Sequence, residues 1–97
     1  MEITVQELKV RLQRKDIPLF LDIREEWEYE EKNIGATNLP FYSMPSRLGE
    51  IENYKHQEII LHCKTGNRGQ KACKFLLQNG FKNVKNVCGG IEAFLES

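Results

Sequence analysis

The chain alternates between stretches with a helical spacing of apolar residues and short stretches that are apolar almost throughout. The first kind predicts helices, and the second predicts strands covered on both faces, as in a parallel sheet. In chain order the pattern predicts a short strand at Ile3, a helix over 5–14, a strand over 18–23, a helix over 25–31, a short strand ending at Pro40, a helix over 43–52, a strand over 58–62, a helix over 69–79, a strand over 84–87 and a helix over 91–95. Alternating strands and helices imply one α/β domain, residues 1–97, with right-handed crossovers.

Local signals support several of these boundaries. Thr4 and Glu7 have the spacing of a capping box at the start of the first helix. Ser43 is expected to cap the helix that follows it, with Pro45 in its first turn. Gly80 is well placed to end the helix before it, because glycine readily adopts the left-handed conformation found at helix ends.

Composition narrows the class of protein. The 97 residues carry 14 basic and 14 acidic side chains, so no overall field favours nucleic acid or an anionic membrane. No run approaches the length of a membrane span, and no signal peptide is evident at the N-terminus. We therefore expect a cytoplasmic protein without a nucleic-acid or membrane partner.

The three cysteines, Cys63, Cys73 and Cys88, are widely spaced and odd in number, which argues against a disulfide framework. A zinc site made by His62 and these cysteines would lack close C-x2-C pairing, so no metal is expected. Cys73 and Cys88 are interpreted as small buried side chains. Only Cys63 has a sequence context that favours reactivity.

Cys63 follows the apolar run Ile59 to Leu61 and opens a loop, CKTGNR, that leads into a helix. Ligands of open α/β sheets bind at the carboxyl ends of strands, where a following helix directs free N–H groups and its positive dipole end at the loop. With Lys64 and Arg68 as neighbouring cations, the thiol should be exposed and largely thiolate near neutral pH. The chain is therefore predicted to present one reactive sulfur.

Four segments in order resemble the rhodanese-like family of single-domain sulfurtransferases, over essentially the whole chain. They are Asp22-Ile23-Arg24 with Glu28-Tyr29, Gly35-Ala36 with Asn38-Leu39-Pro40, the loop Cys63 to Arg68, and Gly89-Gly90 before the last helix. The chain departs from the family pattern at Asn33, where a histidine is usual, and lacks the proline before Gly35. The closing-helix aromatic is assigned to Phe94.

The resemblance implies a rhodanese-like open parallel sheet with helices on both faces, and a sulfurtransferase that needs no cofactor. Cys63 would take sulfane sulfur from a small anionic donor such as thiosulfate, hold it as a persulfide, and pass it to cyanide, a thiol or a protein acceptor. The residue types fit this chemistry, because loop N–H groups and the helix N-terminus can stabilise a persulfide anion. Gly66 lets the backbone curl inward, while Lys64, Thr65, Asn67 and Arg68 can bind the donor or brace the loop.

Two other functions remain open on the sequence. The first is a binding or regulatory module that keeps the fold for docking, and the second is a thiol redox or arsenate-handling enzyme in which Cys73 would resolve Cys63. Cysteine-dependent phosphatases use a loop resembling C-x5-R, whereas Cys63 to Arg68 is C-x4-R, which suggests a pocket sized for sulfur.

The remaining polar and aromatic candidates have structural interpretations. An acid near a thiolate would oppose its ionisation, so Asp22 is predicted to brace backbone or to pair with Arg24. His62 is expected to end its strand as a packed side chain. Trp27 and Tyr29 are expected in the core, and the acidic run from Glu25 to Glu31 is interpreted as a solvated helix face.

Overall fold

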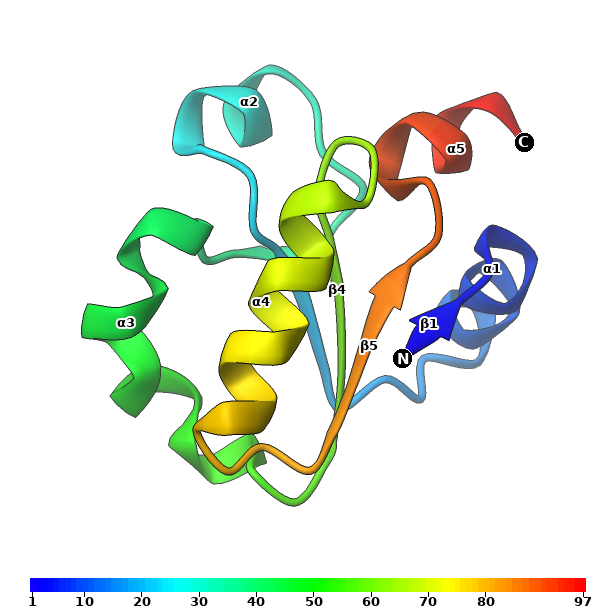
Figure 1. Cartoon of the computed structure of the whole chain (residues 1–97). Coiled ribbons are helices and arrows are strands. Elements are labelled where there is room, and N and C mark those ends of the chain that lie inside the picture. Colours follow the sequence, from blue (N-terminus) through cyan, green and yellow to red (C-terminus); the bar gives the residue numbers. More distant parts are fainter.

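A computed structural model describes all 97 residues and shows one five-stranded sheet flanked by helices (Figure 1). The strands lie in the order β1 (Glu2–Ile3), β5 (Asn83–Val87), β4 (Glu58–His62), β2 (Leu19–Asp22) and β3 (Thr37–Asn38). Every neighbouring pair is parallel, which confirms the predicted open parallel α/β sheet. The carboxyl ends of all strands therefore lie at one end of the molecule.

The helices connect and cover these strands. They are α1 (Val5–Arg14), α2 (Glu26–Glu31), α3 (Met44–Arg47), α4 (Asn67–Gln78) and α5 (Gly90–Glu96), with 3₁₀ helices η1 (Phe41–Ser43) and η2 (Leu48–Tyr54) on either side of α3. None of the helices has the length and apolar character needed to cross a bilayer.

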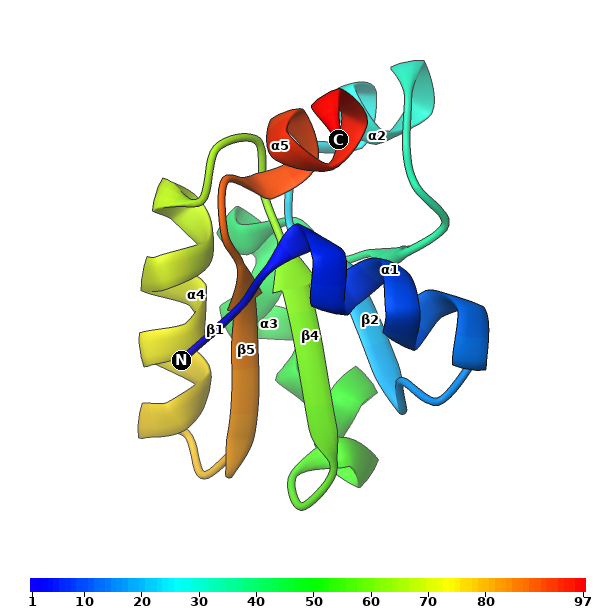
Figure 2. The same ribbon diagram turned by 90° about the vertical axis from the view of Figure 1, so that its right-hand side faces the viewer.

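The sheet has a hydrophobic cluster on each face, which explains why its strands are apolar almost throughout. The larger cluster joins Ile59 and Leu61 of β4 to side chains of α3 and α4. The smaller cluster places Ile60 with α1 and the start of the chain, and α5 packs against it through Phe94. Figure 2 shows α1 in front of the strands and α3 behind them. By the same alternation, Cys63 belongs to the larger cluster on the α4 side.

Two of the predicted helix signals are confirmed. The Thr4 hydroxyl accepts the Glu7 N–H at 3.1 Å, and Glu7 Oε1 accepts the Thr4 N–H at 3.0 Å, which completes the capping box. Gly80 has φ of +91°, and its N–H donates to the Leu77 carbonyl directly after α4.

The predicted helix over residues 43–52 is wrong in detail. Only Met44–Arg47 is α-helical, between the 3₁₀ turns η1 and η2. Ser43 does not cap it through its side chain, because the hydroxyl donates instead to the Pro40 carbonyl at 3.0 Å. Short helical turns of this kind gain most of their stability from packing, here through buried Met44 and Ile51.

The expectation for Trp27 is also wrong, since its side chain is 60% exposed. Helix α2 buries no residue fully, because it lies beyond the carboxyl end of β2, where no second layer covers its outer side (Figure 1). Tyr29 is partly buried, and its hydroxyl donates to the Ala36 carbonyl at 2.6 Å.

Candidate functional site

Cys63 lies directly after β4, at the carboxyl end of the central strand of the sheet. Its sulfur accepts backbone hydrogen bonds from Gly66 at 3.0 Å and Gly69 at 3.2 Å. These N–H groups belong to the loop and the first turn of α4, which curl around the sulfur as the sequence predicted. Convergent N–H groups of this kind form an anion-binding concavity.

The prediction that the thiol is exposed is wrong, because Cys63 is only 1% accessible. The loop folds over the sulfur, and the same backbone groups that bind it also shield it.

The loop conformation depends on Gly66, which has φ of +110° and lies immediately before α4. Asn86 of β5 stabilises this loop conformation, because its Nδ2 donates to the Gly66 carbonyl at 3.0 Å. A Cβ on Gly69 would lie 1.9 Å from Asn86 Oδ1, so only glycine fits there. Asn86 was missed by the sequence analysis, because the predicted strand 84–87 holds two polar residues, Lys85 and Asn86, and its pattern does not show which of them supports the loop.

Helix α5 holds the other side of the loop. The N–H of Ile91 donates to the Cys63 carbonyl at 2.8 Å, and that of Glu92 donates to the Lys64 carbonyl at 3.2 Å. Gly90 makes this approach possible, because it has φ of +65° and a Cβ there would lie 2.5 Å from both carbonyl oxygens. The Gly89-Gly90 pair is therefore part of the site's construction.

The two loop cations do not point at the sulfur. Arg68 makes two hydrogen bonds to the Glu28 carboxylate, at 3.0 and 3.2 Å, and this bonding raises the pKa of Arg68 and lowers that of Glu28. Lys64 is exposed and lies 3.9 Å from Glu92. Arg68 thus braces the loop against α2, one of its two predicted roles. Its partner Glu28 was present in the sequence pattern but had been given no function.

The two remaining loop side chains, Thr65 and Asn67, are exposed at the surface of the loop. Asn67 is the first residue of α4. Both therefore lie where an incoming molecule would meet the loop, and neither is a buried brace.

The predicted pairing of Asp22 with Arg24 is observed. Arg24 Nη2 lies 2.8 Å from Asp22 Oδ2, and the Arg24 N–H donates to Asp22 Oδ1 at 3.0 Å. Arg24 Nη2 also donates to the Lys32 carbonyl at 2.7 Å, at the end of α2. Both side chains are buried, so this pair ties the end of β2 to α2 and supports the Arg68 contact indirectly.

His62 is fully buried and packs against the ring of Phe20, which confirms a packed side chain. Its Nε2 lies 3.6 Å from Asp22 Oδ2, and its Nδ1 lies 3.4 Å from the Cys63 carbonyl oxygen. Burial lowers its pKa, although the Asp22 carboxylate opposes this. The neutral ring is therefore favoured near neutral pH.

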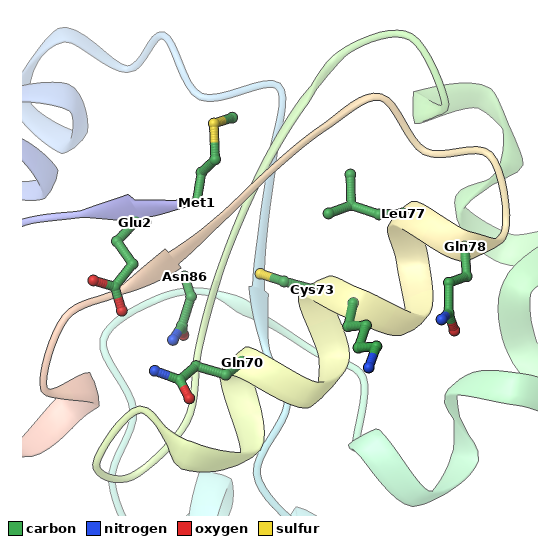
Figure 3. A pocket seen from close by; sticks show the side chains of 8 residues that line it. Met1, Glu2, Gln70, Cys73, Leu77, Gln78 and Asn86 are labelled. Carbon is green, nitrogen blue, oxygen red and sulfur yellow. The ribbon is translucent and has the colours of Figure 1, made fainter.

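The other cysteines are poorly suited to partner Cys63. Cys73 is buried, and burial raises its pKa to about 11, so it stays protonated at neutral pH. Figure 3 shows it with Asn86 in a hollow beside α4, lined also by Met1 and Gln70. Cys88 is half-buried, and its sulfur lies 3.4 Å from a Glu2 oxygen. All three cysteines are free, and no three His, Cys, Asp or Glu side chains come together as a metal site.

Comparison with known proteins agrees with this architecture. A family model described as "Rhodanese-like domain" matches residues 4–97. The chain belongs to the rhodanese-like family. A sulfurtransferase of Allochromatium vinosum is 35% identical over 94 residues, which cover 96% of this chain and 86% of that protein.

Other relatives differ in size. The crystal structure of SSP1007 from Staphylococcus saprophyticus has a TM-score of 0.84 and 34% identity, covering 97% of this chain and 93% of that one. An adenylyltransferase and sulfurtransferase of Arabidopsis thaliana, MOCS3, is 27% identical, and the match covers 95% of this chain but only 23% of that protein. The chain thus matches nearly the whole of one relative and a small part of another, and sulfurtransferase relatives support a general role in sulfur transfer.

Proposed function

We propose that this protein is a sulfurtransferase that carries sulfane sulfur on Cys63. The Cys63 thiolate attacks the outer sulfur of thiosulfate, a new S–S bond forms, and the S–S bond of the donor breaks with its electron pair leaving on sulfite. The product is a Cys63 persulfide anion, so charge and atoms balance without an added oxidant. A thiolate or cyanide then takes the outer sulfur and returns the electron pair to Cys63 Sγ.

The observation that carries this proposal is the pair of N–H groups on Sγ. Gly66 and Gly69 donate to Sγ at 3.0 and 3.2 Å from the loop and the first turn of α4. Fixed donors stabilise a thiolate, and they remain near the charge when it moves to the outer sulfur of a persulfide. A thiol kept only for packing would need neither donor.

The loop geometry also favours sulfur over phosphate chemistry. A phosphoryl group in transfer needs donors around three equatorial oxygens. Here, the loop closes tightly on one sulfur, and its arginine is held by Glu28. We therefore expect no phosphatase activity, and an assay with an aryl phosphate serves as a control measurement.

Intact-mass spectrometry after incubation with thiosulfate tests the proposal. We expect a gain of about 32 Da per sulfur, removed by cyanide or a thiol. Cys63→Ser should abolish the gain, whereas Cys73→Ser should keep it. Absence of the adduct, or its persistence in Cys63→Ser, would refute the sulfurtransferase function and favour a docking module that does not turn over.

A further inference from the structure

Two surface hollows flank the loop that holds Cys63, one near each end of the loop. One hollow, of about 310 Å³, lies between α2 and α5 and is lined by residues that include Trp27, Lys64 and Glu92. The other, of about 280 Å³, is lined by residues that include Tyr42 and Arg68. Figure 2 shows α2 and α5 together at this end of the molecule. A molecule larger than a small anion would therefore meet both hollows as it approached Cys63.

The rim of the loop is acidic, although the whole chain is neutral. We define the rim as residues 25–32, residues 64–68 and Glu92. It holds six carboxylates and three cations, which gives a net charge of −3, while the whole chain has none. Lys64 and Arg68, the cations nearest Cys63, are each paired with a carboxylate. The negative charge of the rim therefore attracts a cationic binding partner at long range, whereas an anionic donor gains only short-range contacts inside the loop.

Each of these hollows is lined by one exposed aromatic side chain, Trp27 in the first and Tyr42 in the second. Trp27 is 60% exposed and Tyr42 is 67% exposed. The Trp27 Nε1–H donates to Glu25 at 3.3 Å, which orients the indole. Exposed tryptophan and tyrosine are the side chains that most often anchor protein interfaces, and their ring faces attract lysine and arginine.

We propose that the rim docks a protein segment in which a reactive cysteine is flanked by lysine or arginine. This inference rests on the proposed persulfide function and names the class of acceptor. The acceptor thiolate attacks the outer sulfur of the Cys63 persulfide, an S–S bond forms on the acceptor, and the Cys63 bond breaks with its electron pair on Sγ. The acceptor leaves as a persulfide, and no oxidant is needed.

The test compares two peptides of equal length that each carry one cysteine, flanked by lysines in one and by glutamates in the other. Each is mixed with the full chain loaded with sulfur at Cys63, and transfer is followed by peptide mass. At low ionic strength the lysine peptide should react about tenfold faster, and added salt should reduce the difference.

Matched variants separate docking from the intrinsic reactivity of the peptides. The double variant Glu30→Gln with Glu31→Gln removes two negative charges from the rim. It should lower the rate of sulfur transfer to the lysine peptide several-fold. Asp16→Asn with Glu52→Gln makes the same change in net charge away from the rim and should have no effect. Trp27→Ala should likewise slow both peptide association and sulfur transfer. Leu77→Ala is the control and should slow neither, because Leu77 is an exposed apolar residue at the far end of α4.

The outcomes are distinguishable. If a small neutral thiol removes the sulfur but the rim variants and their controls behave alike, the docking surface is refuted and the sulfurtransferase function stands. If no persulfide forms on Cys63 with any donor, the proposed function fails and the docking inference fails with it.

Discussion

Arg68, in the first turn of α4, is joined to Glu28 of α2 by two hydrogen bonds, Nη1–Oε1 at 3.0 Å and Nη2–Oε2 at 3.2 Å. The two residues are 40 positions apart, and they connect the loop that carries Cys63 to the helix beside it. The planar fork of arginine is suited to such a two-bond contact. The bridge therefore holds the loop in position as well as balancing charge.

A double-mutant cycle of Arg68→Ala and Glu28→Ala should show a coupling in the free energy of unfolding of about 0.3–1 kcal/mol, because the arginine is partly exposed. The Arg47–Glu50 pair, which is more exposed and lies within one surface segment, is the control and should couple less.

Sulfur transfer should fall in Arg68→Lys, which keeps the charge but loses the fork. Full transfer by Arg68→Ala would show that the bridge is not needed to position the loop.

Gly90→Ala should destabilise the protein by at least about 2 kcal/mol, because a Cβ would meet two carbonyl oxygens at 2.5 Å in a left-handed backbone conformation. Gly49→Ala is the control, since it has no neighbour within 4 Å and no positive φ. Urea unfolding measures both. Equal stabilities of the two variants would mean that α5 does not hold the Cys63 loop as described.

Glu58 predicts a pH dependence of stability at the opposite end of the sheet. Hydrogen bonds from Arg11 and Lys85 hold its pKa at about 2, below the usual 4.5. Its contribution is therefore complete above about pH 4.5 and is lost as the pH falls toward 2. Glu58→Gln should lower the free energy of unfolding by about 1–3 kcal/mol at pH 7, and the difference from the unsubstituted chain should shrink in acid. A constant difference would contradict the ion-pair cause.

The burial of His62 predicts a second pH dependence of stability, which arises from desolvation and not from hydrogen bonds to charged partners. Burial lowers its pKa below 6.5, so both folded and unfolded states hold it neutral above that pH. Below about pH 6.5 the unfolded chain binds a proton more readily, and stability should fall by at most about 1.4 kcal/mol per pH unit. His62→Phe should remove this dependence, and His56→Gln, at an exposed site, should not. The same slope in all three proteins would exclude His62 as its source.

The cysteines should differ in alkylation. A small reagent at pH 7 should modify Cys63 faster than Cys73, because the N–H groups of Gly66 and Gly69 donate to the Cys63 sulfur and can stabilise charge that develops there during the reaction. Cys73 should react slowly, since its pKa is about 11 and its thiol stays protonated at this pH. Peptide mapping against time measures both rates. Modification of Cys73 as fast as Cys63 would mean that the loop does not activate its thiol.

The sequence alone determined the order of strands and helices along the chain, the parallel sheet and the position of Cys63 directly after an apolar strand. These features depend on the spacing of apolar residues and on local signals such as the Thr4–Glu7 capping box. The pairing of Asp22 with Arg24 was also predictable, because the two lie two residues apart at the end of one strand. Each of these relationships is short in sequence, so the chain encodes it locally.

Only the tertiary structure decided which distant groups meet at the loop. Arg68 contacts Glu28 and Asn86 supports Gly66 because parallel crossovers bring α2, β5 and the loop to one end of the sheet. The sequence could not predict that Cys63 is buried or that Trp27 is exposed, since accessibility depends on what packs from other parts of the chain. Apolar periodicity shows which residues need a covering layer, but only the assembled fold shows where that layer ends.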